Sequence, residues 1–275
     1  MIRSRIRPNP TTCLLVTALA VAVFSPIPTW AAGPGTLPTV ASAASPSTSA
    51  AASDSDDTPD QASHLLVMAD FNRDGTADIA RAVLPAGDES GPALLTVSLG
   101  QADGTYKQVF SRTVLGHAPR YIVAGDFNQD GFPDVIVGDD DGELMLFAGD
   151  GTGNLVAAGD IAHLSSVVSI VVADFNHDGI LDVAVTDWRA SSVTVFLGAG
   201  KGLFRKEWSV PLRMPGTSPH LAAADFNGDG IPDLAVVYDD DEGATFDVLL
   251  GNGKGDFTLS PGLSLTRDPN SHCVT

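Results

Sequence analysis

Four copies of one nine-residue motif place acidic and amide side chains at a spacing that suits metal binding. The motif is Asp-Phe-Asn-x-Asp-Gly-x-x-Asp, and its copies begin at Asp70, Asp126, Asp174 and Asp225. In a tight turn the side chains at positions 1, 3 and 5 can all point inward, and the Gly at position 6 can adopt the positive φ that the turn needs. We therefore expect each copy to form a loop that gathers oxygen atoms around one point.

Ligation by oxygen atoms alone is typical of a hard cation, and Ca²⁺ is the first choice. Without a cation the carboxylates would repel, at roughly 4 kcal/mol for two charges about 4 Å apart in an effective dielectric of about 20. The sequence predicts about four structural Ca²⁺ ions, each held by the side chains at positions 1, 3, 5 and 9 and the backbone carbonyl at position 7. The predicted ligands are Asp70, Asn72, Asp74, Thr76, Asp78, Asp126, Asn128, Asp130, Phe132, Asp134, Asp174, Asn176, Asp178, Ile180, Asp182, Asp225, Asn227, Asp229, Ile231 and Asp233.

Two other calcium loops do not fit the motif. An EF-hand needs a bidentate Glu at position 12. Position 12 here falls inside an apolar, strand-like run and is occupied by Arg81, Val137, Val185 and Val236. The Gly-Gly-x-Gly-x-Asp pattern of haemolysin-type repeats is absent. The remaining alternative is four Asx-rich turns that bind no metal.

The elements that must position these loops repeat with them. The copies begin 56, 48 and 51 residues apart, which is close to the period of propeller blades. Each loop is followed by an apolar run, then by a polar turn and a second run that ends in Gly. These second runs are 95–100, 144–149, 193–198 and 246–251, and each is followed by a Gly-rich turn and an apolar residue. Runs of this length between turn signals read as strands, four to a repeat, and their nearly continuous apolar character predicts sheets covered on both faces. We expect an all-β fold, a β-propeller built of four-stranded blades.

The nine-residue motif, the apolar strand and the Leu-Gly-x-Gly-x-Gly-x-Phe-like segment together resemble the FG-GAP/VCBS repeat, the blade unit of integrin-α-type β-propellers. The resemblance covers residues 63–275. It implies that the same side chains bind Ca²⁺ and that the ions brace a hairpin within each blade, which is a structural and not a catalytic role. The family includes adhesion receptors, lectins and accessory modules of secreted enzymes, so the resemblance implies binding without naming a partner.

The Phe at position 2 of every loop is expected to pack between blades. The last five residues, 271–275, match residues 63–67 in phase, as if a fifth repeat were beginning. We therefore expect a partial or truncated propeller of four visible repeats, and whether the ring closes stays open.

The N-terminus is expected to direct export. Residues 1–31 combine three early Arg with a twelve-residue apolar run and small residues near Ala31, which is the pattern of a signal peptide. A retained membrane anchor is the alternative. Residues 32–62 form a Pro/Ser/Ala-rich linker that is expected to be disordered. Cys13 would leave with the signal, so Cys273 alone remains and no disulfide framework is predicted.

The net charge and the absence of catalytic motifs restrict the classes of function that this chain can have. The net charge of −19 argues against nucleic acid as a partner. No Gly-x-Ser-x-Gly motif occurs, and the acidic runs 139–141 and 239–242 outside the loops are interpreted as solvated turns, with a weak extra cation site as the alternative. We therefore predict no catalytic or cofactor-binding residues and no enzyme activity. Trp188, in a turn between strands, is the best candidate for a sugar-stacking platform.

We predict a secreted or cell-surface, calcium-braced β-propeller that binds a glycan or a protein, with no membrane span after signal removal. The alternative is the propeller domain of a secreted polysaccharide-degrading enzyme whose catalytic part is absent here.

Overall fold

The computed structural model describes residues 65–83, 93–113, 118–212, 219–240 and 243–266, and these residues form sixteen β-strands and no helix. Each set of four consecutive strands makes one sheet, which we call blades 1 to 4. The strands are β1 (Leu65–Ala69), β2 (Asp78–Val83), β3 (Leu94–Gly100), β4 (Tyr106–Thr113), β5 (Pro119–Gly125), β6 (Asp134–Asp139), β7 (Glu143–Gly149), β8 (Leu155–His163), β9 (Val167–Ala173), β10 (Asp182–Asp187), β11 (Ser192–Gly198), β12 (Phe204–Pro211), β13 (His220–Ala224), β14 (Asp233–Asp240), β15 (Gly243–Gly251) and β16 (Phe257–Thr266).

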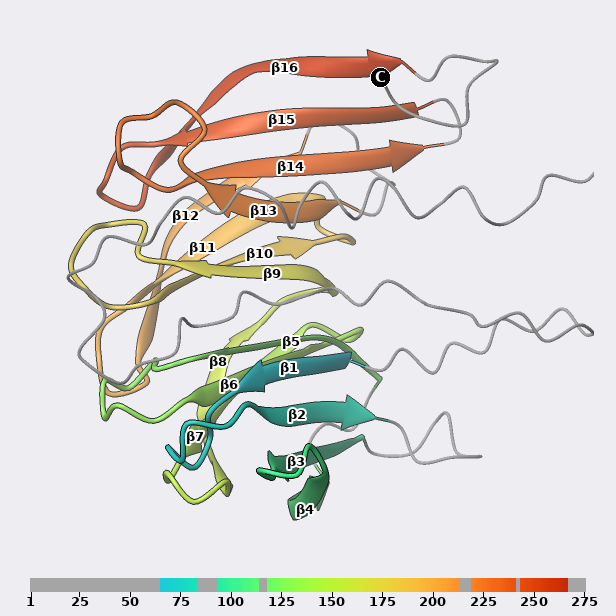
Figure 1. The fold of residues 1–275 in the computed structure, drawn as a ribbon. Coiled ribbons are helices and arrows are strands. Elements are labelled where there is room, and N and C mark those ends of the chain that lie inside the picture. The colour runs from blue at the N-terminus through green and yellow to red at the C-terminus, as the bar shows by residue number, and fades with distance from the viewer. Residues whose placement is uncertain (1–64, 84–92, 114–117, 213–218, 241–242, 267–275) are drawn as a thin grey trace, which may run out of the picture.

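Every blade is an antiparallel meander in which the strands pair in chain order. The first strands of successive blades lie next to one another: β1 contacts β5, β5 contacts β9, and β9 contacts β13. Figure 1 shows the four sheets following one another around this inner row of strands, with β1 and β13 separated by β5 and β9. The predicted all-β architecture of four-stranded propeller blades is confirmed, and over the described residues the blades form an open series, as expected of a partial propeller.

The core lies between blades, in three apolar clusters that each join two neighbours. Alternate residues of one strand serve different clusters: Val135 and Val137 of β6 pack towards blade 1, whereas Ile136 packs towards blade 3. Fully burying a side chain of this size contributes about 1.5 to 3 kcal/mol. Every residue of β6 and β10 is buried, so the prediction of sheets covered on both faces is confirmed for the second strands of blades 2 and 3.

The Phe at position 2 of the loops packs between blades in three cases out of four. Phe71, Phe127 and Phe175 are no more than 1% exposed and each belongs to a cluster between its own blade and the next. Phe226 is 43% exposed, so the packing prediction is wrong for this residue. The reason is that no described strand follows blade 4 to cover it.

Several predictions concern residues outside the described ranges. They are the signal peptide (1–31), the linker (32–62), Cys273 and the match of 271–275 to the start of a repeat. Within the described residues, no helix has the length and apolar character needed to cross a membrane.

Candidate metal loops

The four nine-residue loops, numbered 1 to 4 from their starts at 70, 126, 174 and 225, share one backbone conformation. Each joins the first strand of a blade to the second. Position 4 has a positive φ in every loop, near 60° in three of them, and these residues are Arg73, Gln129, His177 and Gly228. Since positive φ is uncommon for residues other than Gly, its recurrence shows that one specific turn is imposed on all four loops.

The turn brings the oxygen atoms of positions 1 and 3 together around the amide of position 5. In loop 1 the N–H of Asp74 donates to Oδ1 of Asp70 and to Oδ1 of Asn72, each at 3.1 Å. The N–H of Gly75 donates to the other oxygen of Asp70 at 2.9 Å. Loops 2, 3 and 4 repeat these contacts. The side chains at positions 1, 3 and 5 therefore converge, as the spacing of the motif suggests.

The carboxylate at position 5 closes the turn. Oδ1 of Asp74 accepts the N–H of Thr76 at 2.7 Å, and its Oδ2 accepts Nδ2 of Asn72 at 2.8 Å. The hydrogen bond from Asn72 is the main reason that the pKa of Asp74 lies below its ordinary value. Position 7 bonds to position 5 in the same way at Phe132, Ile180 and Ile231.

The carboxylate at position 9 is buried and accepts hydrogen bonds from two distant parts of its blade. Oδ2 of Asp78 accepts the N–H of Phe71, and Oδ1 accepts the N–H of Gly100, the last residue of β3, both at 2.8 Å. Asp134, Asp182 and Asp233 make the same pair of bonds. We call this arrangement the carboxylate bridge, since it ties the first loop residues, the start of the second strand and the end of the third strand.

The bridge explains the Gly that ends every third strand, a marker that the sequence displayed without its reason. A Cβ on Gly149 would lie 2.2 Å from the carbonyl oxygen of Pro133, and one on Gly100 would lie 2.5 Å from that of Ala77. Real side chains do not approach so closely, so only Gly lets the third strand come near enough for its N–H to reach the buried carboxylate.

Burial raises the pKa of the bridging carboxylates in loops 2 and 3. Loss of hydration raises the pKa of Asp134 and of Asp182 to about 6, against the lowering effect of the backbone N–H groups that bond to them. The negative charge of Asp130 adds to the increase at Asp134. In loop 2, Nδ2 of Asn128 lies 3.4 Å from Oδ1 of Asp134, so positions 3 and 9 are also neighbours.

These features define what a cation would need here. Within the described residues, no three Asp, Glu, His or Cys side chains are grouped so that they could hold a metal ion alone. An ion in a loop would therefore also need the amide oxygen at position 3 and the carbonyl at position 7. The bridging carboxylate could still contribute, because an ionised carboxylate has about four acceptor sites and the backbone N–H groups use two of them in loop 1 and three in loop 2. The donor set fits Ca²⁺, which takes six to eight oxygen ligands of mixed kinds.

Neighbouring loops touch through their position 4 side chains. The guanidinium carbon of Arg73 in loop 1 lies 4.9 Å from the centroid of the Phe132 ring in loop 2. Nε2 of Gln129 in loop 2 donates to the carbonyl of Gly179 in loop 3 at 3.3 Å. Loops 1, 2 and 3 are therefore linked in a row at the end of the blades where the first strands finish.

The opposite end of blade 3 carries an exposed aromatic residue on a well-fixed turn. Trp188, between β10 and β11, is 43% exposed, while the preceding Asp187 is buried. The Asp187 carboxylate accepts the N–H of Ser165 at 2.7 Å and that of Ala190 at 3.0 Å. The N–H of Trp188 donates to the carbonyl of Ser166 at 3.1 Å. The backbone is thus anchored on both sides of a side chain that faces solvent.

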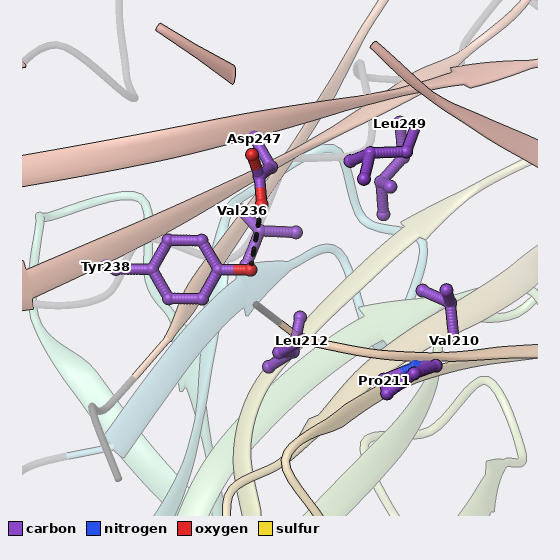
Figure 2. Close-up of a pocket in the computed structure, with 8 residues that line it drawn as sticks. Val210, Pro211, Leu212, Val236, Tyr238, Asp247 and Leu249 are labelled. Carbon is purple, nitrogen blue, oxygen red and sulfur yellow. Dashed lines mark hydrogen bonds between the residues drawn. The ribbon is translucent and has the colours of Figure 1, made fainter. Parts of the chain in front are cut away.

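A small cavity between blades 3 and 4 offers no room for an organic ligand. Its volume is about 20 Å³, enough for about one water molecule. Figure 2 shows its apolar lining and the hydroxyl of Tyr238, which donates to Oδ2 of the buried Asp247 at 3.3 Å.

Comparisons with known proteins give a family and a fold. The family model for the FG-GAP-like repeat matches three consecutive segments, residues 70–137, 126–185 and 184–236. No curated protein matches the sequence. Among solved structures, a protein from Lactobacillus plantarum has a TM-score of 0.52 at 12% identity, over 70% of this chain and 55% of that one.

A second solved structure, the fructofuranosidase from Schwanniomyces occidentalis complexed with fructose, has a TM-score of 0.47 at 10% identity, over 69% of this chain and 44% of that one. The chain thus spans about half the length of either protein. At these identities the first likeness supports the fold alone.

Proposed function

The protein belongs to the FG-GAP-like repeat family, because the three repeat matches together span residues 70–236, more than half of the chain. We propose that it is an exported, calcium-braced β-propeller module that binds a glycan or a protein. The observation that carries the binding role is Trp188, a large aromatic side chain that stays 43% exposed on a turn anchored by hydrogen bonds to the buried residue Asp187.

Trp188 favours a glycan as the ligand. An indole ring offers a flat apolar face with a polar N–H at its edge, which suits a sugar ring that has an apolar face and peripheral hydroxyls. The turn is already ordered, so binding would cost little conformational entropy. Arg189 lies beside it, and Nη1 of this residue donates to the carbonyl of Ser165 at 3.1 Å, which leaves further guanidinium N–H groups for a ligand oxygen.

We expect Trp188→Ala to weaken ligand binding at least tenfold while leaving the melting temperature nearly unchanged. A central aromatic contact commonly contributes about 2 kcal/mol or more to binding, and an exposed side chain contributes little to folding. A glycan array on the calcium-loaded protein identifies the ligand, and titration of both proteins measures the change. Leu203→Ala is the control, because Leu203 is 64% exposed in the β11–β12 turn, at the end that carries the metal loops. Equal binding by the unaltered chain, Trp188→Ala and Leu203→Ala would contradict the role of Trp188. If the only ligand found were another protein, a glycan would be excluded.

The calcium part of the proposal is supported by the convergence of oxygen atoms in each loop and by the cost of placing carboxylates so close together. In loop 3, the charges of Asp174 and Asp178 both raise the pKa of the buried Asp182, so a cation there would relieve repulsion.

We expect Asp74→Ala to remove one calcium site and leave three. Asp74 supplies the position 5 carboxylate of loop 1 alone, and repeat units couple mainly to their neighbours. Isothermal titration calorimetry should give about four sites for the unaltered protein and about three for the variant. Asp103→Ala, which removes an exposed carboxylate from the turn between β3 and β4, is the matched control and should retain all four. An unchanged number of sites in Asp74→Ala would contradict the assignment.

The remaining parts of the proposal are export and the lack of catalysis. The clustered carboxylates of the described residues accept several backbone hydrogen bonds within the loops, which supports a structural role for them. Export is supported by the N-terminal sequence pattern, and it predicts a mature protein that begins after Ala31 or Ala32 when N-terminal sequencing is applied to the secreted form.

A further inference from the structure

Blades 1 and 4 each leave one face partly uncovered, and the burial of their second strands shows it. In β2 buried and half-buried residues alternate along the whole strand, and β14 shows the same alternation from Leu234 to Tyr238. In β6 and β10, by contrast, every residue is buried. Since successive side chains of a strand point to opposite faces, no sheet formed by the described residues covers the other face of blade 1 or of blade 4.

We call the face that a blade turns towards the following blade its forward face, and the other its back face. The forward face of blade 4 repeats the apolar pattern of blade 3. Phe226, Ala235, Val248 and Leu250 occupy the places of Phe175, Ala184, Val195 and Leu197 in the repeat. The four residues of blade 3 are at most 1% exposed in the cluster shared with blade 4. Their counterparts in blade 4 are exposed or half-buried.

The back face of blade 1 keeps apolar residues at three of the places that are buried in blade 2, while Arg81 stands at the place of Val137 and Ser98 at the place of Phe147. Its residues Leu66, Met68 and Ile79 occupy the places of Ile122, Ala124 and Val135 in blade 2. Those three residues of blade 2 are buried in the cluster that joins blade 2 to the forward face of blade 1. Leu66, Met68 and Ile79 are only half-buried.

We propose that the forward face of blade 4 packs against the back face of blade 1 of a second copy of this chain. All three interfaces within the chain pair a forward face with a back face, so this contact continues an interface that the fold already builds three times. Two copies joined head to tail at both ends would close a ring of eight blades, which is within the range of closed propellers. Each copy would then span half of the ring, and the two would be related by a two-fold axis.

The mass of the purified chain in solution tests the proposal. Analytical ultracentrifugation at micromolar concentrations should give twice the mass of one chain. Phe226→Asp should reduce it to the mass of one chain, because it places a charge in the apolar contact. Val156→Asp, on the outer strand β8, is the matched control. Val156 is 57% exposed, so this variant should still have the mass of two chains. If the unaltered chain had the mass of one chain at every concentration up to about 100 μM, the proposal would be overturned, since specific dimers commonly form well below that concentration.

Two further variants fix the arrangement. Leu250→Asp on β15 repeats the test away from loop 4, and circular dichroism confirms that each variant is folded. Ile79→Asp, on the back face of blade 1, should also give single chains, and mixing it with Phe226→Asp should restore dimers, because one intact forward face and one intact back face remain. If Ile79→Asp stayed a dimer, the copies would meet through some other surface, and the head-to-tail arrangement would be wrong.

Discussion

Replacing Asp134 by alanine is expected to lower the free energy of unfolding by about 3 kcal/mol or more. Its carboxylate accepts the backbone N–H groups of Phe127 and Asn128 in loop 2 and of Gly149 at the end of β7. Each buried N–H left without an acceptor costs about 1 to 3 kcal/mol. Part of this cost is offset, because the folded protein no longer has to bury a carboxylate whose pKa burial has raised to about 6.

The measurement must separate the carboxylate bridge from metal binding, since Asp134 is also a candidate ligand. Urea denaturation in excess EDTA does so, because no ion is then bound in either protein. Asp130→Ala is the control: it removes an exposed carboxylate from the same loop and should cost much less under these conditions. A loss of less than 1 kcal/mol for Asp134→Ala would show that the bridge is not a main support of blade 2.

Removal of calcium is expected to lower the melting temperature by about 10 °C or more. With dissociation constants of about 10⁻⁴ to 10⁻³ M, as in extracellular modules, 10 mM Ca²⁺ would stabilise the folded protein by about 1.4 to 2.7 kcal/mol at each site. Four sites that unfold together would contribute about 6 to 11 kcal/mol. For a domain of this size, 1 kcal/mol corresponds to a shift of about 2 to 4 °C.

Thermal unfolding followed in 10 mM CaCl₂ and in excess EDTA tests this prediction, with MgCl₂ in place of CaCl₂ as the control for ionic strength. Mg²⁺ should protect less, because it requires nearly octahedral geometry and gives up its water molecules reluctantly. Identical melting curves in Ca²⁺ and EDTA would contradict the calcium proposal and favour the alternative of four Asx-rich turns without metal.

The repeat, the strands and the turn conformation could be predicted from the amino-acid sequence, because all three depend on residues close together in the chain. Alternating turn signals and apolar runs predicted four strands in each repeat, and the structure has them. The motif required a tight turn with Gly at position 6, and Gly75 has a φ of 84°. The contacts within positions 1 to 7 join residues at most five positions apart, so local spacing was enough to predict them.

The surroundings of these local units depend on the packing of the blades and became visible only in the folded chain. Asp78 belonged to the predicted ligands of loop 1, but its bridge to Gly100 joins residues 22 positions apart and could not be read from the motif. Phe226 occupies the same place in its repeat as Phe175, yet one is 43% exposed and the other 1%. Burial depends on which sheet lies opposite a side chain, and that is a property of the assembled blades, not of the nine residues that recur in each of them.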